Sequence, residues 1–338
     1  MRIGYNPHKD KIQPISDFFH QVIIPIYIPN LEGYFEDSFE ILKYTLESLF
    51  RTSHKKTYFT LINNGSCKNV VEYLNDLLEN GLVHEVMHTS SIGKLNSVLK
   101  GITGHNFKMV TISDADVLFL NDWQEETYKV FNSFSKCGAV SPVPSPKVLK
   151  QYTSNAIVDN LFSRKLKFSK VLNPNALQHF AKSIGNPNFY NEYHLESYLT
   201  IQENNQRAVI GAGHFVATYR GDIFSEEGVR YSKYSLGGGS ENKILDEPVL
   251  LKGYWRLSTL DNYAYHMGNK DEEWMSKLVN NLSNHTNKIV EMKELNKVKT
   301  SKLALWFYEV FFKILKKKIF WFFFLRYKGL SDVASKNY

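Results

Sequence analysis

Cysteine is scarce in this sequence: its 338 residues include only Cys67 and Cys137. Two thiols supply neither a disulfide framework nor the four ligands of a zinc quartet, so we expect a reducing compartment. The segment "MRIGYNPHKD" has no apolar core, so we also expect no signal peptide. We find no internal repeat. These absences favour a cytoplasmic protein.

A long uncharged apolar run is also missing. The tail segment "KLALWFYEVFFKILKKKIFWFFFLRYKGL" is apolar, but Glu309, Lys313 and the run 316–318 interrupt it. A membrane-spanning helix needs about 20 mostly uncharged residues, so we do not expect one here. Aromatic residues beside lysines favour a helix over residues 302–328 that lies on an anionic membrane surface. The alternative is a helix that packs on the rest of the chain or on a second subunit.

The composition supports a folded domain with an acidic partner. Hydrophobic residues make up 43% of the chain, which is enough for a core, and the net charge is +7. An excess of positive charge favours a sugar phosphate, a nucleic acid or an anionic membrane as partner. Much of the excess lies in the tail, so we do not expect nucleic-acid binding.

Strand-like and helix-like segments alternate in the first part of the chain. The β-branched and helical periodicities predict strands near residues 21–30, 57–66, 82–88 and 107–113, with helices near 39–50, 69–81 and 91–102. Such alternation is typical of an α/β fold with an open, mostly parallel sheet. Ligands bind such sheets beyond the carboxyl ends of the strands.

The later part of the chain reads less regularly. "NPNALQHFAKSIG" predicts a helix capped by Asn173 and stopped by Gly185. We expect one strand in "AVIGAGHFVATYR" and another in "YWRLSTLDNYAYHMGN", the latter ending at His266. Between them, "SLGGGSENKILDEPVLLKG" predicts a glycine loop followed by a short helix.

Two carboxylates follow the fourth predicted strand. Asp114 and Asp116 stand one residue apart in "VTISDADVLFL", just where the apolar run stops. Such a pair can share a hard divalent cation, because Mg²⁺ and Mn²⁺ favour oxygen ligands and often take carboxylates together with substrate phosphates. The alternative is that one acid caps the next turn while the other is solvated.

Four segments in order resemble the GT-A fold of family-2 glycosyltransferases: "VIIPIYIP", "TLINNGS", "IGKLNSVLKGI" and "ISDADVLF". The resemblance implies a Rossmann-like nucleotide-diphospho-sugar transferase fold with a mostly parallel central sheet and, in this chain, a C-terminal amphipathic helical extension. We therefore expect a catalytic domain over 1–270, with a nucleotide-sugar-binding half at 20–140 and an acceptor-binding half at 141–270, and an extension over 271–338.

The same resemblance implies a set of site residues. It places a Mn²⁺ or Mg²⁺ ion on Asp116, Asp114 and His266, although His266 could also be an ordinary strand-end residue. It places the nucleotide near Pro25, Tyr27, Asn63, Asn64, Lys94, Asn96 and Asp114. For Lys94 and Asn96 the alternative is a solvated helix face.

The sequence departs from the family at one point, where Asn63 and Asn64 replace an acidic pair. An amide oxygen can accept from the N3–H of uracil, but its NH₂ group can instead donate. UDP remains the expected nucleotide.

An inverting transfer needs a base for the acceptor hydroxyl. Asp246 is the first candidate, Glu247 the second and Glu241 the reserve, all close to the glycine loop. Asp246 could instead be only a helix N-cap. His214 and Arg220 are expected either to line the acceptor side or to belong to a core strand.

These features predict a metal-dependent glycosyltransferase of bacterial surface polysaccharide synthesis, peripheral on the inner face of the cytoplasmic membrane. The donor would be a UDP-sugar and the acceptor a glycan or a lipid-linked molecule, with the enzyme a hexosyl- or N-acetylhexosaminyl-transferase. Two alternatives stay open: a haloacid-dehalogenase-type phosphatase that uses the acids at 114–116, and an inactive sugar-nucleotide-binding module.

Overall fold

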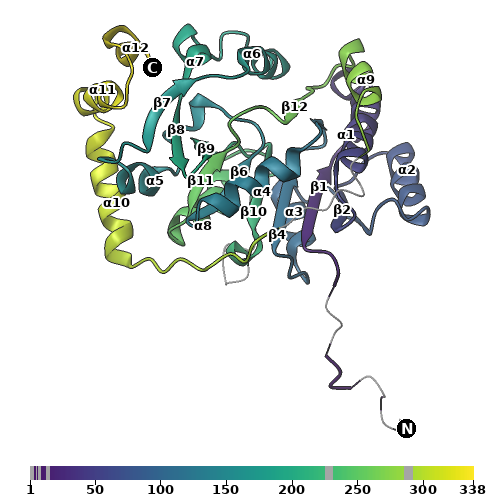
Figure 1. Cartoon of the computed structure of the whole chain (residues 1–338). Helices are drawn as coiled ribbons and strands as arrows, with labels where there is room; N and C mark the ends of the chain where they lie inside the picture. Colours follow the sequence, from purple (N-terminus) through teal and green to yellow (C-terminus); the bar gives the residue numbers. More distant parts are fainter. Residues whose placement is uncertain (1–3, 5, 7–8, 13–15, 225–230, 285–291) are drawn as a thin grey trace.

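A computed structural model describes residues 4, 6, 9–12, 16–224, 231–284 and 292–338 of the chain. A ten-stranded sheet runs through the centre of the molecule (Figure 1). Its strands, in spatial order, are β3 (Glu85–His88), β2 (Thr57–Asn63), β1 (His20–Ile26), β4 (Met109–Ser113), β10 (Val216–Arg220), β6 (Cys137–Ser141), β11 (Trp255–Ser258), β9 (Gln206–Ile210), β8 (Ser197–Glu203) and β7 (Leu166–Lys170).

Most of these strands run in one direction. The pairs β1–β2, β2–β3, β1–β4 and β6–β11 are parallel, whereas β10 is antiparallel to both β4 and β6. Followed across the sheet, β1, β2, β3, β4, β6, β11 and β8 point the same way, and β7, β9 and β10 point the other way. The predicted α/β class with a mostly parallel central sheet is therefore confirmed.

Helices cover both faces of the sheet. The alternation of side chains along β1 sends Val22 and Ile24 to one face, where they pack with α1 (Ser38–Thr52) and α2 (Lys68–Glu79). Ile23 faces the other side, where it packs with α3 (Lys94–Ile102), and further along this face lies α8 (Glu247–Leu251). Because β1 and β4 are buried on both faces, they read as continuous apolar runs in the sequence.

The helices not yet named lie mostly around the second half of the molecule (Figure 1). They are α4 (Trp123–Ser133), α5 (Ser154–Asp159), α6 (Pro174–Ser183), α7 (Glu192–Glu196), α9 (Glu273–Asn280), α10 (Lys302–Leu315), α11 (Lys318–Tyr327) and α12 (Asp332–Asn337). The exception is α9, which packs against α1. As predicted, α6 is capped by Asn173, whose side chain accepts from the N–H of Ala176, and it ends before Gly185, which has a φ of 69°. Helix α4 and strand β6 were not predicted from the sequence.

Two segments expected to form single strands are each divided. "AVIGAGHFVATYR" contains the end of β9 and all of β10, which lie in different parts of the sheet and are joined by residues 211–215. Gly211 marks the break: its φ is 100°, and a Cβ there would lie 2.7 Å from a side-chain carbon of Val148. "YWRLSTLDNYAYHMGN" likewise contains β11 of the large sheet and β12 (Ala264–His266), which pairs with β5 (Val117–Phe119) in a separate two-stranded sheet.

The tail also differs from the expectation of one helix over 302–328. It forms α10 and α11, separated at Lys317, whose backbone is extended (φ −62°, ψ 138°). The break lets Phe312 and Trp321 meet edge to face, with ring centroids 6.3 Å apart, and both join the core beside α4 and α5. Each helix of the described chain is too short or too polar to cross a bilayer.

Candidate active site

The predicted site residues gather at one edge of the sheet. Strands β1, β2 and β4 are parallel and in register, so their carboxyl ends bring Tyr27, Asn64 and Asp114 to the same edge. Pro25 lies within β1 and is half-buried, whereas Tyr27 is exposed and contacts the Phe35 ring edge to face. The position of Asp116 follows from the antiparallel pairing of β5 with β12, which are far apart in the sequence; this pairing sets His266 opposite Val117.

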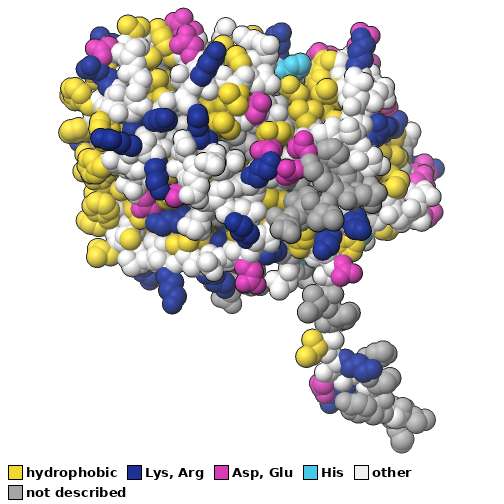
Figure 2. Space-filling view, viewed as in Figure 1, with side chains coloured by type: hydrophobic (Ala, Val, Ile, Leu, Met, Phe, Trp, Pro, Cys, Tyr) yellow, Lys and Arg dark blue, Asp and Glu magenta, His cyan; other side chains and the backbone are white. Residues whose placement is uncertain are grey.

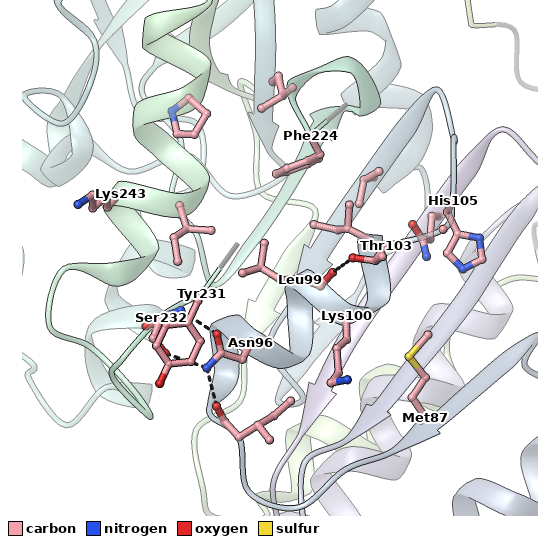
Figure 3. Close-up of a pocket in the computed structure, with 18 of the residues that line it drawn as sticks. Met87, Asn96, Leu99, Lys100, Thr103, His105, Phe224, Tyr231, Ser232 and Lys243 are labelled. Carbon is pink, nitrogen blue, oxygen red and sulfur yellow. Dashed lines mark hydrogen bonds between the residues drawn. The ribbon is translucent and has the colours of Figure 1, made fainter. Parts of the chain in front are cut away.

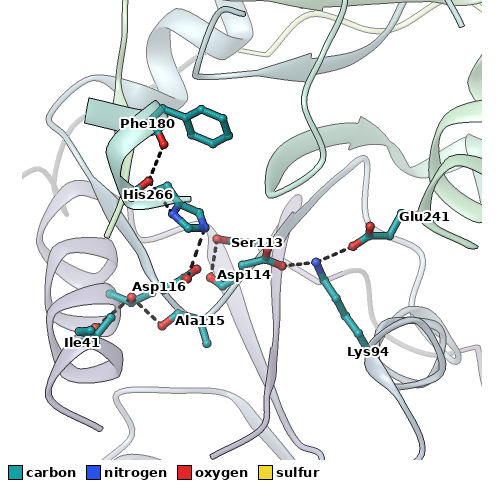
Figure 4. A network of polar contacts seen from close by, with 11 residues as sticks. Ile41, Lys94, Ser113, Asp114, Ala115, Asp116, Phe180, Glu241 and His266 are labelled. Atoms are coloured by element: carbon teal, nitrogen blue, oxygen red, sulfur yellow. Dashed lines mark hydrogen bonds and ion pairs between the residues drawn. The ribbon is translucent and has the colours of Figure 1, made fainter. Parts of the chain in front are cut away.

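Asp116 and His266 face each other across this pairing (Figure 4). Nε2 of His266 lies 3.4 Å from Oδ2 of Asp116, and the backbone N–H of Met267 donates to the Asp116 carbonyl. Oδ1 of Asp116 is buried and has no hydrogen-bond partner among the described residues. Burial raises the pKa of the Asp116 carboxyl. A buried carboxylate oxygen without a donor is costly unless a cation or a proton satisfies it.

The hydrogen bond to Ser183 determines the tautomer of His266, and therefore which ring nitrogen carries the lone pair. The Ser183 hydroxyl donates to the carbonyl of Phe180, so its oxygen accepts from Nδ1–H of His266 at 2.9 Å. In neutral His266 the proton is therefore on Nδ1, and Nε2 presents its lone pair to the carboxylate. Such an outer hydrogen bond is the usual arrangement behind a metal-binding histidine. Asp116 and His266 thus have the chemistry of a two-ligand site for a divalent cation.

Asp114 has a different environment from Asp116. Nζ of Lys94 lies 2.5 Å from Oδ1 of Asp114 and 2.6 Å from Oε1 of Glu241, so one ammonium joins the two acids (Figure 4). Burial alone would lower the pKa of Lys94, but the two carboxylates raise it above its usual value. In this structure the partner of Asp114 is the Lys94 ammonium, and the described residues hold no cluster of three or more metal-binding side chains. The assignment of Asp114 as a metal ligand stays a prediction.

Asn63 and Asn64 have their amide orientations determined by the backbone. Oδ1 of Asn63 accepts from the N–H of Ser66, and Oδ1 of Asn64 accepts from the N–H of Ile92, each at 2.8 Å. A backbone N–H can bond only to the amide oxygen, so both oxygens are already engaged. Nδ2 of Asn63 donates to Nδ1 of His88, which leaves the NH₂ group of Asn64 as the donor at this edge.

Asn96 and a large cavity lie on a different side of α3. Oδ1 of Asn96 accepts from the N–H of Ser232, and Nδ2 donates to the carbonyls of Ser232 and Ile92. Asn96 therefore holds the chain near residue 232 against α3 instead of offering free polar atoms. It lines a cavity of about 1140 Å³ together with Leu99, Lys100, Tyr231 and Lys243 (Figure 3). None of the acids discussed above lines this cavity.

Asp246 is not the side-chain cap of α8. It occupies the N-cap position without a capping hydrogen bond, and its carboxylate lies 2.7 Å from a terminal nitrogen of Arg256. Both side chains are completely buried. Glu247, the second candidate base, begins α8 and is half-buried. Arg256 was missed by sequence analysis, although a lone arginine in an otherwise apolar strand signals a buried partner.

His214 and Arg220, both expected on the acceptor side or in a core strand, lie in different parts of the structure. His214 lies near the site, 3.4 Å from both Asp246 and Glu241. Arg220 pairs in register with Met109, at the opposite end of β4 from Asp114. It is buried against Asp222 and the Tyr254 ring and donates to the carbonyls of Leu295 and Asn296, so it belongs to the core and anchors the chain leading to α10.

Comparison with known proteins gives distant structural likenesses. No protein-family model matches the sequence, and no curated protein matches it. The fold is similar to that of mannosyltransferase PcManGT from Pyrobaculum calidifontis in complex with GDP-Man and Mn²⁺, at 14% identity and a TM-score of 0.35. That match covers 61% of this chain and 45% of the other, so this chain spans less than half of the mannosyltransferase.

A second likeness covers more of the chain. Residues 1–349 of S. aureus TarS, in complex with UDP-GlcNAc, match 94% of this chain and 69% of that one, at 11% identity and a TM-score of 0.42. Both TM-scores are below 0.5, so the likenesses carry no detail of the site.

Proposed function

We propose that this protein is a metal-dependent glycosyltransferase that moves a sugar from a nucleotide-diphosphate donor, with UDP as the nucleotide, to a glycan or lipid-linked acceptor in bacterial surface polysaccharide synthesis. The observation that carries the proposal is the facing pair of Asp116 and His266 beyond the carboxyl ends of the parallel strands. The buried Oδ1 of Asp116, which has no hydrogen-bond partner among the described residues, and the oriented Nε2 lone pair of His266 suit a divalent cation. Asp116 and His266 would hold Mn²⁺ or Mg²⁺, which neutralises charge on a diphosphate leaving group when bound.

The chain's own residues prepare the surroundings of that cation. Ser183 holds the tautomer of His266, and the rings of Phe180 and Phe215 lie 5.8 Å and 5.4 Å from the His266 ring. These aromatic neighbours limit the access of water to one side of the imidazole, which strengthens electrostatic interactions there. Lys94 adds a fixed positive charge at the first acid, Asp114.

The nucleotide would lie where β1 and β2 end. The exposed ring of Tyr27 offers a stacking surface, and the NH₂ group of Asn64 offers a donor. A uracil carbonyl can accept from that donor, so UDP is compatible with the asparagine that replaces the acid of the family. Discrimination against other bases would then rest on this donor and not on an acceptor for N3–H.

The tail supports a membrane-associated acceptor. Hydrophobic side chains project along the edge formed by α10 and α11 (Figure 2). Trp306, Phe307, Phe320 and Phe323 are each at least half exposed. Lys313 and residues 316–318 are exposed beside them. Aromatic side chains next to lysines suit the headgroup region of an anionic bilayer, where a lipid-linked acceptor would be presented. Trp321 lies in the segment 302–328 that was predicted to face the membrane, but its side chain is 6% exposed and part of the core.

A screen of UDP-, GDP-, ADP- and CDP-sugars for hydrolysis, with and without Mn²⁺ and without added acceptor, tests the proposal. We expect metal-stimulated release of the nucleoside diphosphate from at least one donor. Release of inorganic phosphate from p-nitrophenyl phosphate without any sugar-nucleotide turnover would favour the phosphatase alternative. Binding of a sugar nucleotide without turnover in any condition would favour an inactive binding module.

A further inference from the structure

His214 lies between two carboxylates that come from the glycine-loop segment. Its Nδ1 is 3.4 Å from Oδ2 of Asp246, and its Nε2 is 3.4 Å from Oε2 of Glu241. The three side chains differ in access to solvent: His214 is 30% exposed, Glu241 is 17% exposed and Asp246 is 0% exposed. An incoming hydroxyl group can therefore reach the imidazole in this structure, whereas it cannot reach the carboxylate behind it.

The backbone joins His214 to the proposed metal site. The carbonyl of Phe215, the next residue, accepts from the N–H of Asp114 at 2.8 Å. The Phe215 ring contacts the His266 ring at 5.4 Å. On the other side, Glu241 shares Lys94 with Asp114. His214 is thus placed beside the residues that would receive the donor.

Four charged groups around His214 come from three elements. Asp246 belongs to the short turn of helix Asn242–Asp246, Glu241 precedes it, Lys94 begins α3, and Arg256 lies in β11 behind Asp246. Burial and Lys94 favour the neutral imidazole, but the two carboxylates outweigh them and raise the pKa of His214 above its usual value of about 6.5. The neutral, basic form of His214 is then populated at a higher pH than in an ordinary histidine.

We propose that His214 takes the proton of the acceptor hydroxyl, and that Asp246 is a positioning residue that orients the imidazole. This inference rests on the proposed function. The acceptor O–H bond breaks and its proton goes to an imidazole nitrogen, while the oxygen forms a bond to the anomeric carbon. The bond from that carbon to the nucleoside diphosphate breaks, and its electron pair leaves with the diphosphate. The imidazolium then returns the proton to solvent.

This arrangement gives a role to the Asp246 carboxylate even though it is completely buried. A carboxylate paired with Arg256 at 2.7 Å and closed off from solvent is a poor proton acceptor for an external hydroxyl. The same carboxylate is well suited to hold an imidazole in one orientation. The sequence predicted Asp246 as the base; in this inference its carboxylate instead acts through His214.

The pH dependence of donor hydrolysis separates the two assignments, with water as the acceptor and a UDP-sugar and Mn²⁺ as the probe. In the wild-type protein, log kcat/KM should rise with pH to a midpoint above 6.5. His214→Gln should lose this limb and lower kcat by roughly 10²- to 10⁴-fold, the usual contribution of general-base catalysis. Asp246→Asn or Glu241→Gln should move the midpoint to lower pH, because each removes a carboxylate that raises the pKa of His214. His105→Gln, near the other end of the sheet beside Glu85, should match the wild type.

A second measurement does not depend on turnover. NMR of protein labelled with ¹⁵N at histidine should show a resonance that is absent in His214→Gln, titrates above pH 6.5, and shifts to a lower midpoint in Glu241→Gln or Asp246→Asn. The Glu241 variant serves if the Asp246 variant does not fold. If His214→Gln hydrolyses the donor with the same rise of kcat/KM with pH as the wild type, the inference is overturned while the proposed function stays intact. Absence of hydrolysis of every sugar nucleotide by the wild-type protein would contradict the proposed function and this role together.

Discussion

The guanidinium of Arg256 lies 2.7 Å from the carboxylate of Asp246, and both side chains are completely buried. Arg256 also donates to the carbonyls of Gln151 and Ala212, so it ties β11 to two loops beside the site. Burying one of these charges without the other would leave it uncompensated in a low-dielectric interior. The pair therefore couples the stability of the fold to the geometry around His214.

Arg256→Met should destabilise the protein strongly. It leaves the Asp246 carboxylate completely buried without its arginine, and removing one partner of a buried pair typically costs about 3–5 kcal/mol of the free energy of unfolding. Urea unfolding followed by tryptophan fluorescence measures the change. Lys165→Met is the matched control, since it removes a surface ion pair with Glu203 and should cost less than about 1 kcal/mol. If both substitutions lower the free energy of unfolding equally, the buried pair contributes no more to stability than a surface ion pair does.

Asp116→Asn should weaken Mn²⁺ binding and reduce metal-stimulated hydrolysis of a UDP-sugar by roughly 10²-fold or more. Loss of residues that only support a ligand already costs about 10- to 100-fold, so loss of a ligand should cost at least as much. Titration with Mn²⁺ monitored by electron paramagnetic resonance gives a readout apart from activity. Asp76→Asn, on the exposed side of α2, is the control and should bind Mn²⁺ as the wild type does. Unchanged Mn²⁺ affinity in Asp116→Asn would remove the metal assignment.

Asn64→Asp should raise the preference for UDP over CDP. The backbone N–H of Ile92 keeps one oxygen engaged, and the new second oxygen can accept from the N3–H of uracil, which cytosine lacks. A hydrogen bond to a charged group contributes about 1.5–3 kcal/mol, so the affinity ratio should change by about tenfold or more. Calorimetry with both nucleotides in the presence of Mn²⁺ measures it, with Asn80→Asp at the exposed end of α2 as control. An unchanged ratio of UDP to CDP affinity would show that the nucleobase does not bind at Asn64.

The double substitution Phe320→Ser and Phe323→Ser should abolish most binding to vesicles containing phosphatidylglycerol without unfolding the protein. Both rings are more than half exposed, and each would contribute about 1.5–3 kcal/mol when buried in the interface. The exposed lysines add about 1 kcal/mol each, so wild-type binding should weaken as salt is added.

Trp321→Ala is the contrasting variant for the tail. Its ring is buried against Phe312 and Phe324, so its loss should cost about 3–5 kcal/mol of stability. If the intact protein binds no vesicles and sediments as a dimer that the double substitution dissociates, a second subunit covers this surface and the membrane proposal is wrong.

The stability should depend on pH through Lys328. Its ammonium is buried and donates to the carbonyls of Asn160 and Ser163, and burial lowers its pKa to about 8. The unfolded chain then binds more protons than the folded one between about pH 8 and 10.4, so the free energy of unfolding should rise with pH in this window. The penalty is fully present below pH 8.

Comparing variants isolates this effect from other titrating groups. Lys328→Met should lack the rise between pH 8 and 9.5 in urea unfolding, whereas Lys336→Met, at an exposed position of α12, should keep it. A rise of the same size in both variants would assign the pH dependence to other groups.

The sequence by itself determined the first half of the fold. Val22, Ile24 and Leu61 lie in runs whose periodicity and turn residues are local, and so the strands, helices and parallel order near Asp114 were predictable. The second half depended on contacts that are distant in the chain. "AVIGAGHFVATYR" has the composition of one strand, and only the pairing of β10 with β4 and β6 decides where it divides. The same is true of β11 and β12.

For the site, the chain itself suggested candidate residues, because two acids after a buried strand are locally conspicuous; their roles stay predictions. It could not decide how they are paired. Lys94 lies 20 residues before Asp114 and 147 residues before Glu241, and their ion pairs exist only in the folded protein. Nor could it show that Asp246 is buried while His214 is accessible, or that Trp321 packs inward while Phe320 faces outward. Burial and charge pairing depend on which distant segments cover a residue, and for this reason only the tertiary structure decided them.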